Sequence, residues 1–181
     1  MNEIEAKMKV PDFDAIRRRL KSAGAKPSGD RQETNVFFDT PSASLRRADK
    51  GLRLRTHRDM KTGRCEFVVT FKGPRQPGKL KVRQEIEFNV SDPAPVTAAF
   101  VALGFEISIS FQKRRRTWTL DKCEIALDEL PFLGTFVEIE GPTAAAVMHV
   151  RKLLDLNKEP LISDSYASMM SHYLKIKRKE G

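Results

Sequence analysis

Cysteine is nearly absent from this sequence: the 181 residues include only Cys65 and Cys123. Neither has a partner at metal-ligand spacing, so the sequence predicts no disulfide and no zinc site. Each cysteine alternates with apolar neighbours, and we expect both to be small buried hydrophobic side chains. The sequence also lacks an apolar run of roughly 18 residues, and its first ten residues do not resemble a signal peptide. These absences predict a cytoplasmic protein without a membrane association.

Three familiar catalytic patterns are missing as well. The sequence contains no G-x-x-x-x-G-K-[ST] phosphate loop, no G-x-G-x-x-G dinucleotide motif and no Ser/His/Asp set. The sequence therefore does not support the mechanisms that depend on these motifs.

The composition is that of one globular domain spanning residues 1–181, with 40% hydrophobic and 31% charged residues. The formal net charge is +9, which favours anionic partners. Runs of three arginines at 17–19 and 114–116 invite a nucleic-acid interpretation. They lie in separate elements and lack interleaved aromatic residues or a known binding motif, which argues against nucleic acid as the partner.

Short strands and a few helices alternate along the chain. We expect strands at 2–10, 32–39, 51–58, 64–72, 79–90, 105–120, 122–129 and 134–140. Helices are expected from Asp12, as N-cap, to Gly24, from the segment SDPAPV to Gly104, and over 143–155 and 163–176. About eight strands in a mostly antiparallel order, with helices between them, predict an α+β barrel with its strands over about 1–141 and C-terminal helices over about 143–176.

The strands carry charged residues at every second position. Alternate residues of a strand share one face of the sheet, so these charges face one side and apolar residues the other. The charged face is expected to include Glu3, Glu5 and Lys7; Arg53, Arg55 and His57; Thr70 and Lys72; Lys81, Arg83, Glu85 and Glu87; Asp128; and Glu138 and Glu140. In the strand around 113–118 either Lys113, Arg115 and Thr117 or Arg114 and Arg116 share that face. The first set is favoured because Trp118 and Leu120 then lie on the apolar side.

An ordinary antiparallel sheet with one solvated face would show a similar alternation. Here the alternate positions hold charges almost exclusively, they fall in the middle of most strands, and both signs occur. If the sheet closes and helices cover its apolar exterior, the charged face must line the interior. Lysine and arginine would then match phosphate oxygens, while carboxylates would tolerate the same anion only with a divalent cation between them. The pattern therefore indicates metal-assisted phosphoryl chemistry.

The motifs of the chain resemble those of the CYTH superfamily, the triphosphate tunnel metalloenzymes. The N-terminal Glu3-Ile-Glu5-Ala-Lys7 reads as E-x-E-x-K and is followed in the expected order by further blocks. These are FFDTP at 37–41, GLRLR at 51–55, TFKGP at 70–74, VRQEIEF at 82–88, QKRRRTW at 112–118, LDELPFLGTFVEIE at 127–140 and SDSYASMM at 163–170. Within this superfamily the chain is most similar to class IV adenylate cyclase-like proteins. The similarity lies in its size, in KGP followed by R-x-E-x-E, and in the terminal Ser-Tyr.

The resemblance implies an eight-stranded antiparallel closed barrel with catalysis inside it and Mg²⁺ or Mn²⁺ as cofactor. It implies triphosphate binding by Lys7, Arg53, Arg55, Lys72, Arg83, Lys113 and Arg115. It implies metal binding or support by Glu3, Glu5, Glu85, Glu87, Asp128, Glu138 and Glu140, and a part in catalysis for Glu3, Glu5, Lys7, Lys72 and Lys113. The chain departs from the family's D-x-Y-F block, where it has Asn35 and Phe37, and this departure concerns the part of the substrate beyond the phosphates.

Two reactions fit such a tunnel. A cyclase would convert ATP to cyclic AMP and pyrophosphate, which the resemblance favours, whereas a triphosphatase would hydrolyse inorganic triphosphate, thiamine triphosphate or a nucleoside triphosphate. A non-catalytic module that binds polyphosphate or nucleotides is a third interpretation. His57 either contacts phosphate or metal or has no role, and Tyr166 either packs the C-terminal helix or approaches the substrate; the second interpretation of His57 and the first of Tyr166 are favoured. The sequence does not determine the oligomeric state, and a homodimer is left open.

Overall fold

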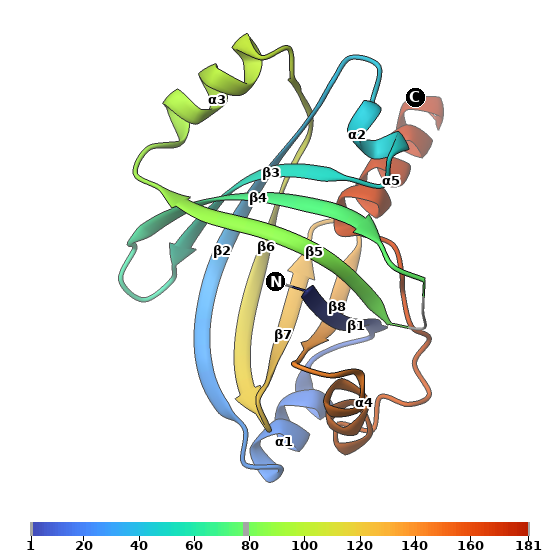
Figure 1. Cartoon of the computed structure of the whole chain (residues 1–181). Helices are drawn as coiled ribbons and strands as arrows, with labels where there is room; N and C mark the ends of the chain where they lie inside the picture. The colour runs from blue at the N-terminus through green and yellow to red at the C-terminus, as the bar shows by residue number, and fades with distance from the viewer. Residues whose placement is uncertain (1, 78–79, 181) are drawn as a thin grey trace.

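The computed structural model describes residues 2–77 and 80–180. Its strands are β1 (Asn2–Val10), β2 (Lys26–Asp39), β3 (Gly51–Asp59), β4 (Cys65–Arg75), β5 (Lys81–Val90), β6 (Glu106–Leu120), β7 (Cys123–Leu130) and β8 (Gly134–Glu140). Its helices are α1 (Asp14–Ser22), α2 (Ser44–Arg47), α3 (Pro93–Ala102), α4 (Ala144–Leu153) and α5 (Tyr166–Glu180). Figure 1 shows the strands wrapped around one interior with helices outside.

The strands close into a barrel in the order β1-β5-β4-β3-β2-β6-β7-β8. All neighbouring pairs are antiparallel, and β1 closes the barrel by pairing with both β5 and β8. The runs β2 to β5 and β6 to β8 are successive hairpins, joined along the long β2–β6 pair. The predicted eight-stranded antiparallel closed barrel with exterior helices is confirmed.

The apolar core lies outside the barrel, between its outer face and the helices. One cluster packs the apolar faces of α1 and α4 onto β1, β7 and β8, including Met8, Ile125 and Val137, which are fully buried. A second cluster places Phe100 of α3 against Phe38 of β2. In these two clusters the outward-facing strand residues are apolar and covered by helices, and the charged residues that alternate with them face inward.

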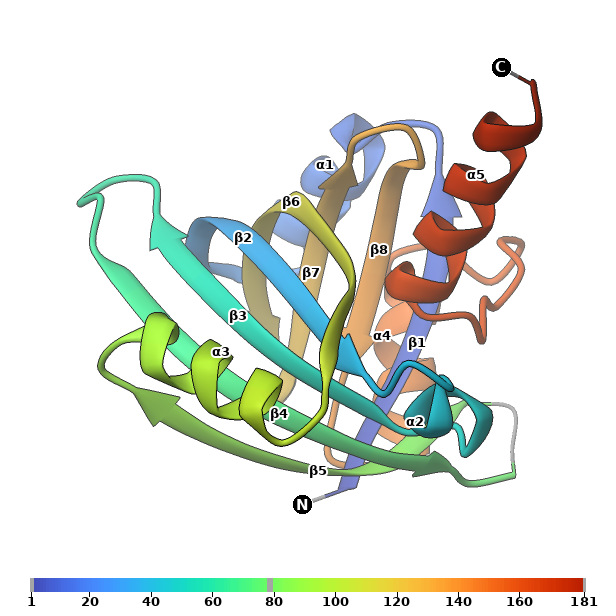
Figure 2. The same ribbon diagram turned by 90° about the horizontal axis from the view of Figure 1, so that it is seen from above.

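The ends of the barrel differ, as the two views in Figures 1 and 2 show. The short helix α2 and the first turns of α5 lie at one end, whereas α1 lies away from them. Asp39 holds α2 in place because its carboxylate accepts hydrogen bonds from the backbone N–H of Thr40, Leu45 and Arg46. None of the described helices is both long and apolar enough to cross a membrane.

Several expectations about single elements were wrong. β2 begins at Lys26 rather than at 32, and its first residues pair with β6 through an irregular register at Pro27 and Gly29. Gly29 is required there, because a Cβ atom would lie 2.8 Å from Thr117 Oγ1. Helix α2 was not predicted, and the N-cap residue of α1 is Phe13 rather than Asp12, although the Asp12 carboxylate accepts a hydrogen bond from the Asp14 N–H.

The two cysteines differ in exposure. Cys123 is buried, as predicted, but Cys65 is exposed. Cys65 is the first residue of β4 and pairs with Arg58 at the end of the β3–β4 hairpin. The residues paired there lie beyond the stretch of the hairpin that packs against α3, so the apolar alternation around Cys65 does not lead to burial.

Candidate functional site

A cavity of about 660 Å³ opens at the barrel end that carries α2 and the start of α5. All the cations that the motifs assign to phosphate line it, namely Lys7, Arg53, Arg55, Lys72, Arg83, Lys113 and Arg115. They come from β1, β3, β4, β5 and β6, so closure of the barrel brings together residues that are far apart in the sequence.

The inward orientation of these side chains follows from strand alternation. Lys113, Arg115 and Thr117 of β6 are buried inside the barrel. Arg114 and Arg116 point to the opposite face, where each contacts Asp30 of β2. The choice between the two sets of β6 residues is thereby decided in favour of Lys113 and Arg115.

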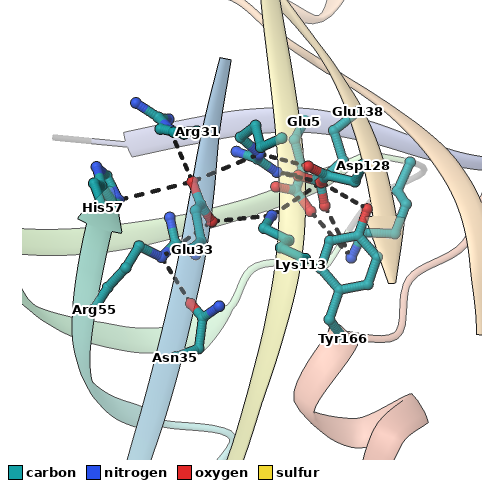
Figure 3. A network of polar contacts seen from close by, with 12 residues as sticks. Glu5, Arg31, Glu33, Asn35, Arg55, His57, Lys113, Asp128, Glu138 and Tyr166 are labelled. Atoms are coloured by element: carbon teal, nitrogen blue, oxygen red, sulfur yellow. Dashed lines mark hydrogen bonds and ion pairs between the residues drawn. The ribbon is translucent and has the colours of Figure 1, made fainter. Parts of the chain in front are cut away.

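Asp128 is the centre of a buried network in the barrel (Figure 3). It is completely buried, and its carboxylate accepts hydrogen bonds from Lys113 Nζ at 2.9 Å and Arg115 Nε at 2.7 Å. The Tyr166 hydroxyl donates a third hydrogen bond to it at 2.9 Å. These contacts orient Lys113 and Arg115. The Asp128 carboxylate is therefore already bound to two cations and one hydroxyl group.

Tyr166 therefore both packs the C-terminal helix and reaches the cavity. Its ring packs edge-on against Phe136, and it also lies 4.1 Å from Lys7 Nζ and 4.8 Å from Lys113 Nζ. Lys7 Nζ donates a further hydrogen bond to the Asp164 carbonyl oxygen at 2.9 Å. The segment before α5 is thus part of the wall that holds these two lysines.

Glu33 is a second buried acid, and sequence reasoning missed it. Its side chain is fully buried between Arg31 Nε at 3.0 Å, Arg55 Nε at 3.3 Å and Lys113 Nζ at 3.4 Å. Burial raises the pKa of Glu33, but the surrounding cations outweigh it and hold the pKa well below its usual value. Glu33 is therefore ionised and offsets the repulsion between these cations.

His57 contacts Glu33 from the adjacent strand, with 3.7 Å between Nε2 and Oε1. Burial lowers the pKa of His57 to about 3, and the nearby arginines add to this effect against the opposing charge of Glu33. The imidazole is neutral near pH 7. His57 does not line the cavity, so the structure gives no support to a phosphate contact by this residue.

The cations on β3, β4 and β5 form the opposite wall of the cavity. Arg53 Nη2 donates to Thr70 Oγ1 at 2.8 Å and lies 3.4 Å from Glu87, while Lys72 pairs with Glu85. Burial, together with the charge of Arg55, lowers the pKa of Arg53 to about 10, which leaves it charged at neutral pH. Arg83 Nη2 donates to the Asp49 carbonyl oxygen at 2.7 Å.

Several buried donors in this cavity lack an acceptor. Among the described residues, Arg53 Nε, Arg83 Nε and Asn35 Nδ2 are buried nitrogen atoms without a hydrogen-bond partner, and all three residues line the cavity. A buried polar group without a partner costs about 1–3 kcal/mol. The residues that carry these groups line the cavity together with its other cations, so a ligand rich in acceptor oxygens suits this wall.

Besides Asp128, the described carboxylates expected to hold metal lie in two places: Glu5, Glu138 and Glu140 are neighbours on β1 and β8, whereas Glu85 and Glu87 lie on β5. Glu5 and Glu138 lie 3.9 Å and 3.2 Å from Lys7 Nζ, and Glu138 lines the cavity. Glu85 and Glu87 instead contact Lys72 and Arg53, and the side chain of Glu87 is half exposed. Glu140 is exposed, and the Glu3 side chain lies outside the described residues.

Glu5 and Glu138, which both lie near Lys7 Nζ, are the described carboxylates that could hold a single Mg²⁺ or Mn²⁺. Across the described part of the chain, no group of three or more His, Cys, Asp or Glu side chains is placed to hold a metal ion. Mg²⁺ in phosphate sites usually takes one or two carboxylates together with phosphate oxygens and water, and Mn²⁺ accepts oxygen ligands of the same kind. Two carboxylates that already surround the Lys7 ammonium group can supply these ligands.

Comparison with known proteins identifies the family. A CYTH-domain model matches residues 1–166, and the chain therefore belongs to the CYTH family of triphosphate tunnel proteins. The Methanocaldococcus jannaschii protein "Putative adenylate cyclase MJ0240" is 27% identical over 178 residues, covering 93% of this chain and 98% of that protein. "Adenylate cyclase CyaB" of Aeromonas hydrophila is 27% identical over 138 residues, covering 76% of this chain and 67% of that protein.

Solved structures show the same fold. The PH1819 protein of Pyrococcus horikoshii superposes with a TM-score of 0.83 at 26% identity, covering 94% of this chain and 99% of that chain. A Hippeastrum protein, HpAC1, described as a "putative adenylyl cyclase" with a dominant triphosphatase activity, has a TM-score of 0.70 at 18% identity, covering 94% and 95%.

Proposed function

We propose that this chain is a metal-dependent enzyme that binds the triphosphate of ATP in the barrel cavity and converts ATP to cyclic AMP and pyrophosphate. The observation that carries the proposal is the convergence of the cavity cations with the unmatched N–H groups of Arg53, Arg83 and Asn35. A triphosphate supplies both the negative charge and the acceptor oxygens that this wall lacks.

The residues of the chain bind and orient the substrate. Arginine and lysine side chains on both walls hold the phosphates, while Asp128 and Glu33 keep Lys113 and Arg115 in fixed positions. Glu5 and Glu138, together with Glu3 as the resemblance implies, would hold Mg²⁺ or Mn²⁺. When bound, the metal neutralises part of the phosphate charge and polarises the reacting phosphoryl group.

The reaction is a displacement at the α-phosphorus. The ribose 3′-oxygen bonds to this phosphorus, the bond to the oxygen that bridges to the β-phosphorus breaks, and pyrophosphate leaves with the electron pair. The hydroxyl proton passes to water. A pre-ordered wall of cations stabilises the charge that develops on the leaving group.

The second candidate is a triphosphatase, in which water attacks the terminal phosphorus and orthophosphate is released. The same cation wall suits both reactions, and the Hippeastrum protein of this fold is described with a dominant triphosphatase activity. The names of the M. jannaschii and A. hydrophila relatives, which share more sequence with this chain, favour the cyclase.

Product analysis distinguishes these reactions. The protein is incubated with ATP and, separately, with inorganic triphosphate, in Mg²⁺, in Mn²⁺ and in EDTA, and the products are separated by chromatography. We expect cyclic AMP and pyrophosphate from ATP, and only with metal. ADP with orthophosphate, or pyrophosphate from triphosphate, would establish the hydrolase instead. Tight binding without any product would leave a non-catalytic module.

The Glu138→Gln variant tests the metal site. It keeps the size of the side chain and removes its charge, so we expect less than about a tenth of the wild-type rate, given the several kcal/mol that such a metal supplies. Glu129→Gln is the matched control, because Glu129 is exposed on the neighbouring strand β7 and lies on the opposite face from Asp128, next to Arg116. A Glu138→Gln enzyme with near wild-type turnover and metal dependence would contradict the assignment.

A further inference from the structure

The cavity has an apolar wall in addition to its charged ones. On β2 and β6, towards the open end, its lining includes Phe37, Ile107, Ile109 and Phe111. The rings of Phe37 and Phe111 are stacked, with centroids 6.0 Å apart and planes inclined by 13°. Both side chains are only partly buried. A pair of parallel aromatic rings thus borders the space in which the cations lie.

The position of this pair relative to the charged residues follows from the strands. Phe111 lies two residues from Lys113 on β6, and Phe37 lies two residues from Asn35 on β2. Two residues along a strand span roughly 7 Å. A ligand whose phosphates contact Lys113 would therefore place its other end next to the aromatic pair.

Core packing does not account for Phe37. Phe38, its neighbour in sequence, belongs to the cluster beneath α3, and Phe111 contacts the cluster that contains Tyr166 and Phe136. In the described part of the chain, Phe37 is a member of none of the three apolar clusters. Its ring faces the cavity, with Phe111 as its aromatic partner.

A polar group accompanies the rings. Asn35 is buried beside Phe111 in the β2–β6 register, its Oδ1 accepts a hydrogen bond from Arg55 Nε at 2.7 Å, and its Nδ2 has no partner. Flat ring faces with a hydrogen-bond donor at their edge suit a flat heteroaromatic group, because such a group stacks on rings and carries acceptor atoms.

We propose that Phe37 and Phe111 form the subsite for a heteroaromatic ring attached to the triphosphate, so that the cavity selects nucleoside-type triphosphates over inorganic triphosphate. This inference rests on the proposed triphosphate site, but it holds for either reaction, cyclisation or hydrolysis. It identifies the residues that set which triphosphate is bound, as distinct from those that hold the phosphates.

Calorimetric titrations with Ca²⁺ in place of Mg²⁺ test the proposal, because Ca²⁺ also takes oxygen ligands, and chromatography of the mixture confirms that no product forms during the titration. The ligands are ATP, ribose 5-triphosphate, which keeps the sugar and phosphates but lacks the ring, and tripolyphosphate. Phe37→Leu and Phe111→Leu keep an apolar side chain and remove the flat ring. Phe132→Leu is the matched control, because Phe132 is exposed and stacks on Tyr173 outside the cavity. Circular dichroism and thermal melting confirm that each variant is folded.

We expect each cavity variant to weaken ATP binding about tenfold, from the loss of stacking on the ring. Binding of ribose 5-triphosphate and of tripolyphosphate should change less than about twofold, and Phe132→Leu should change none of the three. Phe37→Trp, which offers a larger flat surface, should retain ATP binding.

Three results would overturn the inference, and the third is distinguishable from the first two. Equal losses for all three ligands, or no loss for ATP, would exclude a ring subsite while leaving the triphosphate site intact. Failure of the wild-type protein to bind tripolyphosphate or ATP would remove the proposed function together with the subsite.

Discussion

At the residue scale, the interior of this barrel is a set of buried charges that balance one another. Taking a single charge out of water costs several kcal/mol, so each buried ion must be compensated. Asp128 has Lys113 and Arg115 as partners, and Glu33 adds a second negative charge next to Lys113. These acids allow a dense group of cations to stay charged in the folded protein, which is the state that binds a polyanion.

The ionisation of Lys113 can be tested through the pH dependence of tripolyphosphate binding. Burial, with the charge of Arg115, lowers the pKa of Lys113 below its usual value, although Asp128 and Glu33 favour the charged form. As the pH rises through this lowered pKa, the free protein loses a positive charge that would attract phosphate. We therefore predict that tripolyphosphate affinity declines at a pH below the usual pKa of a lysine.

The Lys113→Arg variant should move this decline to higher pH, because a guanidinium stays charged. Calorimetry between pH 8 and 11 measures it, and Lys152→Arg, at an exposed position of α4, is the control. An unchanged profile in Lys113→Arg would assign the decline to another group, such as Arg53, and contradict the prediction.

At the element scale, α5 and the segment before it complete the site. The backbone N–H of Ile162 donates to the Lys7 carbonyl oxygen at 2.8 Å, and Tyr166 contacts Lys7, Lys113 and Asp128. Burial and the nearby carboxylates raise the pKa of Tyr166 well above its usual value, so its hydroxyl remains a donor. The C-terminal segment is thus a part of the tunnel wall.

Substitutions at Tyr166 should separate the effect of its hydroxyl group, which bonds to Asp128, from the effect of its ring, which contacts Lys7 and Lys113. Tyr166→Phe removes the hydroxyl from a buried carboxylate and should lower the free energy of unfolding by about 1.5–3 kcal/mol, while tripolyphosphate affinity changes little. Tyr166→Leu also removes the ring next to the two lysines, and we expect a further loss of about fivefold in affinity. Urea unfolding and calorimetry measure the two effects, with Tyr173→Phe on the same helix as control. Equal affinities of the Phe and Leu variants would exclude a role for the ring.

Elements with a regular pattern could be predicted from the sequence, and irregular ones could not. β8 has the predicted bounds, and the alternation around 113–118 identified the inward residues of β6. The first residues of β2 contain proline and glycine, which usually mark a turn, and only pairing with β6 makes them a strand.

The cations of the site could be predicted, because they alternate with apolar residues along their strands. The buried acid and the contacts between strands could not. Glu33 shares its face of β2 with an arginine, an amide and an aromatic residue, so no charge alternation singled it out. The lack of hydrogen-bond partners at Asn35 and the stacking of Phe37 on Phe111 depend on residues from other strands. Such contacts appear only when the barrel closes.

At the scale of the whole molecule, the positive charge is not spread evenly with respect to the cavity. The net charge is +9, and exposed cations at the cavity mouth include Lys50 and Lys175. Arg18 and Lys21 are also exposed, but they lie on α1, which lies well away from α2 in both views (Figures 1 and 2). Charges separated by more than about 8 Å are largely screened at physiological salt. The field that guides a triphosphate into the tunnel should therefore come from the charges at the mouth.

Two double variants with the same net charge test this view. Lys50→Glu with Lys175→Glu, and Arg18→Glu with Lys21→Glu, each lower the net charge from +9 to +5. We expect the first pair to slow association of a ribose-labelled fluorescent ATP about threefold to tenfold at low salt, because it reverses the steering field at the entrance. The second pair should change the rate much less.

Stopped-flow measurements over a salt series should show the difference between the two pairs shrinking as the Debye length approaches about 3 Å at 1 M. Dissociation should change less than association in both variants, because neither removes a residue of the buried wall. Equal slowing by the two pairs would mean that the total charge of the molecule, and not its position around the tunnel entrance, governs substrate capture.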